Sequence, residues 1–390
     1  MVEEVRVLKK KKREWIMKKK IIAVILMMCM VNIVACGNKE SNQQANSGNQ
    51  LSMEEQEKVE SESASVETDS NMQNNSVAGE GQIATYGGAV LNIADLEHQD
   101  DNAESVVYYT SDISPESLMA VYESLGVELT GENIAVKVHT GESEQSNHLR
   151  PDFIKELVQH VDGTIVESNT AYGGSRAETA MHYQLAKDHG FTEIADVVIM
   201  DEKGSMSLPV EGGSILKENL VGARFGEFDG MLVLSHFKGH MLGGFGGSIK
   251  NISIGIASTE GKCLIHTGGA SNTSPWGGES PVFMDSMAEA GKSVVDALSG
   301  NILFINVMNN LSIDCDCTAR LSEADIHDIG ILASTDPVAL DQACVDLIYI
   351  SEGSQSMIDR IEGVGGEDTL EHGEEIGLGN RAYNLVVMDE

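Results

Sequence analysis

One stretch of the sequence, residues 235–251, concentrates side chains that could do chemistry. It reads SHFKGHMLGGFGGSIKN, and its polar candidates are His236, Lys238, His240, Lys250 and Asn251. Imidazole rings bind metals and transfer protons near neutral pH, whereas an ammonium group attracts an anion. Glycine-rich backbone, here including Gly246 and Gly247, leaves amide groups open to an anion or cofactor. The stretch therefore predicts an active site built from side chains and backbone together.

The two histidines of this stretch are also candidate metal ligands. Side chains four residues apart on an extended segment share a face but lie some way from each other, so chelation requires a tight bend. In the alternative interpretation one histidine packs against the glycine loop, the other faces solvent, and Lys250 is an ordinary surface lysine. The candidate catalytic residues are His236, Lys238, His240 and Lys250, and the candidate ligand-binding residues are Gly246, Gly247 and Asn251.

Two cysteines, Cys315 and Cys317, alternate with acidic residues in the sequence DCDC. Thiolates beside histidines suit zinc, nickel or iron, so we predict that they join His236 and His240 as metal ligands. A disulfide between cysteines separated by one residue would be strained, which leaves metal binding, a free dithiol or burial. The alternative is a turn that carries two buried cysteines.

Further polar residues follow other predicted strands. Lys137 and His139 point the same way if one strand runs through both. Tyr172 belongs to a flexible loop, and Arg176 follows at a predicted helix start, where an arginine suits a carboxylate or phosphate. We predict ligand-binding roles for all four residues. The alternatives are a solvent-facing pair at 137 and 139 and a structural salt bridge at Arg176.

Short β-rich runs alternate with amphipathic helical patterns from residue 105 onward. The predicted strands cover residues 105–109, 133–138, 164–167, 196–201, 230–234, 302–307, 329–333 and 383–388. The predicted helices cover residues 115–125, 151–161, 176–189, 283–298, 337–349 and 368–376. The alternation predicts an α/β fold with a mostly parallel sheet flanked by helices, in one large domain or two intimate subdomains. Ligands of such sheets lie beyond the carboxyl ends of the strands, where the candidate residues fall.

The N-terminus has the pattern of a lipoprotein leader. Lysines at positions 18–20 precede an apolar run at 21–34 that is too short for a comfortable membrane span, and Cys36 follows the small residue Ala35. This resembles a bacterial lipobox, with Met17 as the natural start, residues 1–36 as the leader and Cys36 as the lipidated residue. We therefore expect lipid anchoring to the extracytoplasmic face of the cell membrane. A signal-anchor helix with an incidental cysteine is the alternative.

Composition separates a tether from a globular part. Residues 37–85 are rich in Ser, Asn, Gln and Glu and contain no aromatic residue, which predicts a disordered tether ahead of a domain at 86–390. The formal net charge of −35 repels nucleic acid and argues against a DNA- or RNA-binding role. The motifs of serine hydrolases, zincins, P-loop NTPases and Rossmann dehydrogenases are absent from the sequence.

Three longer stretches, SHFKGHMLGGFGGSIKNISIGIAS, FINVMNNLSIDCDC and DIGILASTDPVALDQACVDLI, resemble the domain-of-unknown-function 362 family of bacteria and archaea. The resemblance spans residues 106–388 and implies kinship with iron–sulfur proteins that carry a ferredoxin-type insert after the glycine-rich motif. This chain has no cysteine between Cys263 and Phe283, so we expect no ferredoxin-type iron–sulfur module. The pattern around His236, His240 and Lys250 is also similar to lactate racemase and its relatives, which are associated with a nickel-pincer nucleotide.

Together these observations predict a membrane-anchored lipoprotein whose enzyme domain depends on a metal or cofactor and acts on a small anionic substrate. A transition metal is the candidate cofactor. The first alternative is a non-catalytic lipoprotein that holds a small ligand in the same pocket. The second is a scaffold that has lost its activity.

Overall fold

The computed structural model describes residues 79–317 and 323–389. The predicted leader, the lipidation site Cys36 and the predicted tether as far as residue 78 lie outside these residues. Within the described part of the chain, no helix is long and apolar enough to cross a membrane. β1 (Gln82–Ala84) pairs with β2 (Val90–Asn92) and buries Ile83, so folded structure begins before the boundary predicted at residue 86.

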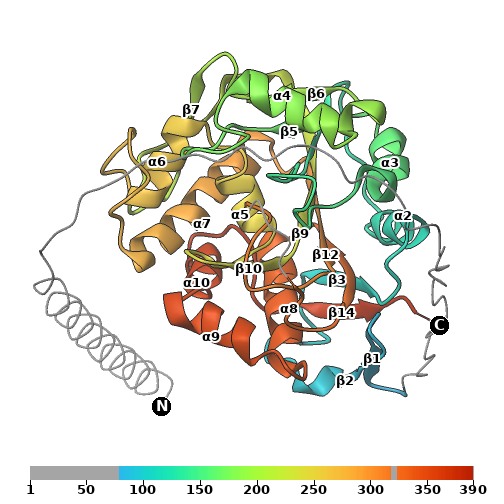
Figure 1. The fold of residues 1–390 in the computed structure, drawn as a ribbon. Coiled ribbons are helices and arrows are strands. Elements are labelled where there is room, and N and C mark those ends of the chain that lie inside the picture. Colours follow the sequence, from blue (N-terminus) through green and yellow to red (C-terminus); the bar gives the residue numbers. More distant parts are fainter. Residues whose placement is uncertain (1–78, 318–322, 390) are drawn as a thin grey trace, which may run out of the picture. The chain divides into compact units, whose positions relative to one another are not determined.

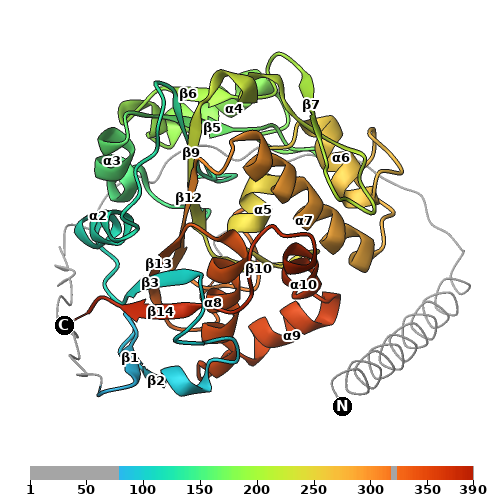
Figure 2. The same cartoon turned by 180° about the vertical axis from the view of Figure 1, so that it is seen from behind.

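An eight-stranded sheet runs through the middle of the domain (Figures 1 and 2). In spatial order its strands are β14 (Asn384–Val387), β3 (Val106–Thr110), β13 (Gly330–Ser334), β12 (Ile302–Met308), β9 (Gly230–His236), β4 (Ile134–Lys137), β5 (Gly163–Glu167) and β6 (Val197–Ile199). β13 runs antiparallel to β12 and β3, and the other pairings are parallel. The prediction of an α/β fold with a mostly parallel sheet is confirmed.

Helices cover both faces of this sheet. One face packs against α2 (Pro115–Ser124), α3 (Pro151–His160) and α4 (Thr179–Asp188). The other packs against α5 (Ser248–Ser253) and α8 (Pro337–Ile350), and further helices lie on these two: α7 (Ser280–Ala297) on α5, α9 (Gln355–Val364) on α8, and α10 (Asp368–Glu375) on α7 and α8, with α6 (Thr259–Thr267) beside α7. The sequence of β9 explains why both faces are covered: Met231 and Val233 point into one hydrophobic core, and Leu232 and Leu234 point into the other. Successive strand side chains point to opposite faces, so a strand buried on both sides is apolar throughout.

Local sequence explains two of the helix starts. α2 begins at Pro115, where the Ser114 hydroxyl accepts a hydrogen bond from the Ser117 amide, and α8 begins at Pro337, where the Asp336 carboxylate accepts bonds from two backbone amides. Both starts agree with the prediction. The predicted helix at 176–189 was wrong at its start, because α4 begins at Thr179 and leaves Arg176 in the preceding loop. α5, α6 and α9 were not predicted.

The order of the strands opens a crevice at one edge of the sheet. In the sheet, β5 and β6 follow on one side of β4, whereas β9 and β12 lie on its other side. Loops that leave the carboxyl ends of β4 and β9 therefore diverge, as at other ligand sites in such sheets. The hairpin of β10 (Lys238–His240) and β11 (Gly244–Gly246) follows β9 directly at this edge.

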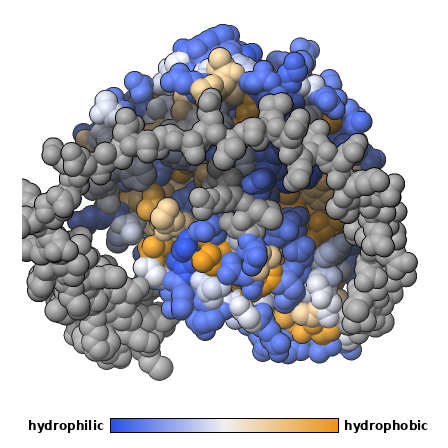
Figure 3. All heavy atoms as spheres, in the orientation of Figure 1, coloured by the Kyte–Doolittle hydropathy of each residue, from blue (hydrophilic) through white to orange (hydrophobic). Residues whose placement is uncertain are grey.

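The remaining elements are peripheral. β7 (Ser205–Pro209) and β8 (Glu218–Gly222) form an antiparallel hairpin, and short 3-10 helices occupy Ile93–Asp95, Phe191–Glu193 and Ala223–Glu227. Figure 3 shows that hydrophilic residues cover much of the visible described surface, with apolar residues gathered in separate patches.

Candidate active site

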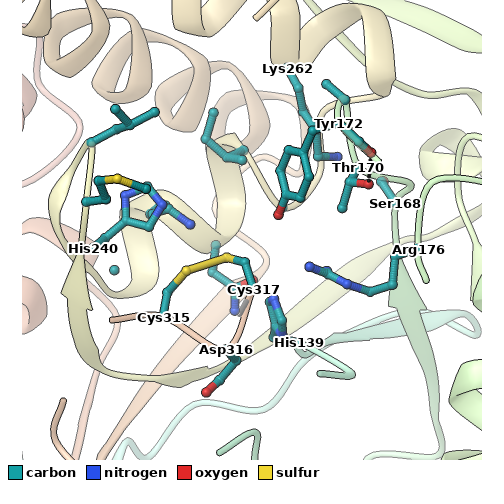
Figure 4. A pocket seen from close by; sticks show the side chains of 18 of the residues that line it. His139, Ser168, Thr170, Tyr172, Arg176, His240, Lys262, Cys315, Asp316 and Cys317 are labelled. Atoms are coloured by element: carbon teal, nitrogen blue, oxygen red, sulfur yellow. Dashed lines mark hydrogen bonds between the residues drawn. A yellow bond between two sulfur atoms is a disulfide. The ribbon is translucent and has the colours of Figure 1, made fainter. Parts of the chain in front are cut away.

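A cavity of about 420 Å³ lies at the carboxyl ends of β4, β5 and β9. This volume falls in the usual range of small-molecule sites, roughly 300–1,000 Å³. The residues singled out in the globular part of the sequence all line it: Lys137, His139, Tyr172, Arg176, His236, Lys238, His240, Gly246, Gly247, Lys250, Asn251, Cys315 and Cys317. The fold therefore brings together residues from four separate segments, while their individual roles stay predictions. Figure 4 shows several of them facing a common space.

A buried ion-pair network forms one wall of the cavity. The Lys137 ammonium donates to Glu167 Oε2 at 2.9 Å and to the Val138 carbonyl at 2.6 Å. Arg176 donates to Glu142 Oε2 at 2.9 Å and to Glu167 Oε1 at 3.4 Å. Burial by itself would raise the pKa of Glu167, but the charges of Lys137 and Arg176 outweigh it and hold that pKa below its usual value. Arg176 is thus held by structural salt bridges, the alternative left open by the sequence.

His139 follows the same strand but does not belong to it. β4 ends at Lys137, and His139 Nδ1 accepts a hydrogen bond from the Gly141 amide at 3.0 Å. Burial, reinforced by the positive charge of Arg176, lowers the pKa of His139 well below its usual value. Its imidazole is therefore neutral at neutral pH, and the Nδ1 bond places the proton on Nε2.

His236, Lys238 and Asp316 form a second cluster. The Lys238 ammonium lies 2.7 Å from His236 Nδ1 and forms an ion pair with Asp316. His236 Nε2 donates to the Asn309 carbonyl at 2.6 Å. Burial would raise the pKa of Asp316, but the charge of Lys238, together with the contact to His236, holds it well below its usual value. Both ring nitrogens of His236 have partners in this arrangement, so its proposed role as a metal ligand has no support from the geometry.

Two further lysines at the cavity have no carboxylate partner within the described residues. Lys262 donates to the Ala257 carbonyl at 2.6 Å, and no hydrogen bond or ion pair of the Lys250 ammonium occurs in this part of the chain. Burial lowers the pKa of Lys250 to about 8, and the nearby charges of Lys238 and Arg176 act in the same direction. Burial also lowers the pKa of Lys262 to about 8. Within the described residues, these two ammonium groups are the positive charges of the cavity that have no direct carboxylate contact, although the charges of Asp201 and Glu167 act on Lys262 from farther away.

His240, Cys315 and Cys317 form a group that could hold a metal ion. One potential ligand atom from each residue lies within 4.8 Å of the other two. The two cysteines are joined in a disulfide, contrary to the expectation from their spacing (Figure 4). The turn at this point holds their Cα atoms 5.2 Å apart, which is inside the ordinary range for a disulfide.

With the disulfide formed, His240, Cys315 and Cys317 cannot all act as metal ligands. The two sulfurs are bonded to each other, and metals take deprotonated thiolates. His240 Nδ1 accepts a hydrogen bond from the Gly243 amide at 2.9 Å, and burial lowers the pKa of this histidine well below its usual value. The neutral ring therefore carries its proton on Nε2. Metal binding through the three residues requires reduction of the disulfide and loss of the Gly243 bond, either because Nδ1 binds the ion or because the ring proton moves from Nε2 to Nδ1.

A buried carboxylate in α8 fixes the position of Lys250 and Asn251. Asp341 accepts hydrogen bonds from the Ser248 amide at 2.7 Å and the Ile249 amide at 2.9 Å, at the start of α5. Burial raises the pKa of Asp341 to about 6. A Cβ on Gly247 would overlap the Asp341 carboxylate, so glycine is required there by close approach. Asn251 donates to Ser235 Oγ at 3.1 Å and ties α5 to β9.

Some lining residues were missed by the sequence analysis, notably Glu167, Lys262, His266 and Trp276. Lys262 and His266 lie four residues apart on α6, a helix that was not predicted, although that spacing was visible in GKCLIH. Glu167 ends a predicted strand, but its partner Lys137 lies 30 residues earlier in the sequence. No signal in the sequence pairs the two.

Comparison with known proteins gives one family and distant structural likenesses. The family described as "Domain of unknown function (DUF362)" matches residues 134–346. No curated protein matches the chain. Among solved structures, the lactate racemase apoprotein from Thermoanaerobacterium thermosaccharolyticum has 17% identity and a TM-score of 0.38, covering 69% of this chain and 62% of its own. A Thermotoga maritima protein has 16% identity and a TM-score of 0.34, and the match covers 67% of this chain and 58% of the Thermotoga protein. The chain thus spans less than two thirds of either structure.

Proposed function

The chain belongs to the family described as Domain of unknown function (DUF362), and we propose that its cavity is the active site of an enzyme acting on a small organic anion. The observation that carries this proposal is that, among the described residues, no carboxylate directly contacts the ammonium groups of Lys250 and Lys262 at the cavity. A ligand with negative charge would supply the missing partner. The reaction class we propose is acid–base chemistry on that ligand.

Charge balance inside the cavity supports an anionic ligand. Five basic residues line it: Lys137, Arg176, Lys238, Lys250 and Lys262. The lining carboxylates are Glu167, Asp314 and Asp316, and each already has a basic partner, Asp314 pairing with Arg360 at 3.6 Å. Removing an ammonium from water without a partner costs several kcal/mol. In a protein with a net charge of −35, a cavity lined by five basic residues and three carboxylates selects negatively charged ligands.

Lys250 is the residue we assign to proton transfer. Its pKa of about 8 lies close to neutral pH, so protonated and neutral forms are both present. An acid–base group works best when its pKa is near the working pH. Lys262 is held by a backbone carbonyl and fits a binding role, and the Lys137–Glu167–Arg176 network keeps the opposite wall rigid.

A transition metal is the cofactor that we propose for this site, bound by His240 and the reduced forms of Cys315 and Cys317. Imidazole and thiolate donors suit zinc, nickel or iron, and three protein ligands leave a position open. When bound, such an ion would act as a Lewis acid on the ligand. The assignment of Lys250 does not depend on it.

We further propose that the protein is held at the extracytoplasmic face of the membrane by lipid on Cys36. This rests on the leader pattern of residues 1–36, where the basic, apolar and cysteine parts follow in the order of a lipobox. Cys36→Ser should move the protein from the membrane fraction to the soluble fraction. Unchanged membrane association of this variant would favour a signal-anchor helix instead.

Binding of inorganic phosphate by calorimetry tests the anion site directly. Lys250→Met should weaken binding at least tenfold, because it removes an unpaired charge at the cavity. Lys217→Met is the matched control, since Lys217 is exposed and does not line the cavity. Equal affinity of both variants and the wild type would refute the proposal.

Proton exchange separates an enzyme from a binding protein. A panel of small organic acids and phosphate esters is incubated with the protein in D2O, and carbon-bound deuterium is followed by NMR. Exchange of at least one compound, lost in Lys250→Met, is expected for the enzyme. Anion binding without exchange of any compound would favour the non-catalytic alternative.

A further inference from the structure

The cavity has its charged residues inside and apolar residues at its mouth, the reverse of the ordinary pattern. Lys137, Arg176, Lys238 and Lys262 are all buried. Four lining residues are large, apolar and exposed: Tyr172 at 40%, Leu242 at 37%, Met241 at 69% and Trp276 at 65%. They come from three segments, the loop after β5, the β10–β11 hairpin and the connection between α6 and α7. Their meeting at one opening is a property of the tertiary structure.

We propose that the natural ligand is an organic phosphate monoester with an apolar or aromatic body, bound with its phosphate inside the cavity and its body against Tyr172 and Trp276. This inference rests on the proposed anion site and specifies its ligand class. A ligand of this shape satisfies both unusual features at once, the unpaired charges inside and the exposed apolar surface outside.

The inner end of the cavity favours a phosphate over a carboxylate. A phosphate monoester carries a charge of about −1.5 to −2 at pH 7, which suits the two ammonium groups of Lys250 and Lys262, neither of which has a direct carboxylate contact in the described residues. Arg176 has its guanidinium engaged by Glu142 and Glu167, so it is not free for a two-pronged contact with either a carboxylate or a phosphate, and recognition of the anion falls to the lysines. Lysine ammonium groups act instead as point charges around a phosphate.

The mouth of the cavity favours an aromatic or otherwise apolar body. Tyr172 extends its ring over the space shared with Arg176 and Lys262 (Figure 4). Trp276 is among the largest exposed apolar side chains of the described chain, and exposed aromatic surface at a cavity rim is typical of ligand contact. The volume of about 420 Å³ also exceeds what an inorganic ion needs and suits a small organic molecule.

A matched set of probes tests each part of the ligand with the full-length protein. The probes are inorganic phosphate, phenyl phosphate, benzoate and phenol, with affinities measured by calorimetry. Phenyl phosphate should bind at least tenfold more tightly than inorganic phosphate, benzoate or phenol. Benzoate binding as tightly as phenyl phosphate would overturn the phosphate assignment, and equal affinities of phenyl phosphate and inorganic phosphate would overturn the apolar body.

Tryptophan fluorescence supplies an independent readout of the mouth. The sequence holds two tryptophans, Trp15 and Trp276, so Trp276→Phe separates their signals. Phenyl phosphate should quench the Trp276 signal, whereas inorganic phosphate should not. Trp276→Ala should lower the affinity for phenyl phosphate at least fivefold and change the affinity for inorganic phosphate by less than twofold. An equal loss of affinity for both compounds would contradict a contact between Trp276 and the apolar body of the ligand.

Failure of this inference is distinguishable from failure of the anion site. If inorganic phosphate binds and Lys250→Met weakens it, the anion site stands whatever the result with phenyl phosphate. If neither phosphate binds, the anion site and the ligand class both fall.

Discussion

Replacing Glu167 by glutamine tests whether the buried ion-pair network holds the wall of the cavity. The substitution keeps the shape of the side chain and an oxygen that can accept from the Thr140 amide and Arg176. It removes the negative charge that Lys137 meets at 2.9 Å. The Lys137 side chain is 1% exposed, so its ammonium cannot turn to water without moving the strand.

The expected cost follows from burial. Removing one partner of a buried ion pair destabilises a protein by about 3–5 kcal/mol, because the other charge stays buried and unpaired. Glutamine retains some hydrogen bonding, so we expect the low end, about 3 kcal/mol. At roughly 2 °C per kcal/mol for a domain of this size, the melting temperature should fall by about 6 °C.

Denaturant unfolding measures this loss as a lower midpoint with an unchanged slope. Glu227→Gln is the matched control, because Glu227 pairs with Lys203 at 3.1 Å while their side chains are 43% and 60% exposed. Exposed pairs of this kind contribute about 0–1 kcal/mol. Lys137→Met added to Glu167→Gln removes the stranded ammonium and should recover part of the loss.

The pH dependence gives a second check. The pKa of Glu167 is held below its usual value in the folded protein, so the carboxylate contributes stability above the unfolded pKa of about 4.3. This contribution is lost as the pH falls through the folded pKa. The difference in free energy of unfolding between wild type and Glu167→Gln should therefore be largest at neutral pH and should decrease below about pH 4. A loss no larger than that of Glu227→Gln at pH 7 would refute the reasoning.

Three further predictions concern the cavity. Phosphate affinity should fall above pH 8, because the pKa of Lys250 is about 8 and the anion binds its charged form, and it should also fall below about pH 6, where phosphate itself takes up a proton; calorimetry of Lys250→Met should show a weaker fall above pH 8. A dithiol reductant should expose two titratable thiols and allow one Zn²⁺ per chain to bind, whereas untreated protein and Cys315→Ser should not take up the ion at this site. Gly247→Ala should cost about 1–3 kcal/mol in denaturant unfolding, because its methyl group overlaps Asp341, while Gly173→Ala, with open space around it, should cost far less.

Most of the sheet and several helices could be predicted from local patterns. Apolar runs such as residues 302–307 mark strands buried on both faces, and Ser114 and Asp336 mark helix starts by capping chemistry. The direction of β13 could not be predicted, because a strand buried on both faces has the same apolar composition whichever way it runs. The start of α4 was misplaced because Arg176 is drawn into the loop by Glu142 and Glu167, which are distant in sequence.

Local sequence pattern was enough to place several candidate residues after the strands, and those residues do line the cavity, whereas Lys262, His266 and Trp276 lie on segments that no strand pattern marks. Strand ends meet at one edge of a parallel sheet, so His240, Lys250 and Cys315 could be grouped before their distances were known. Only the tertiary structure decided how these groups are paired. The charge state of a buried lysine depends on whether a carboxylate from elsewhere in the chain reaches it. Lys137 meets Glu167, whereas Lys250 meets none in the described residues, and no local pattern distinguishes the two.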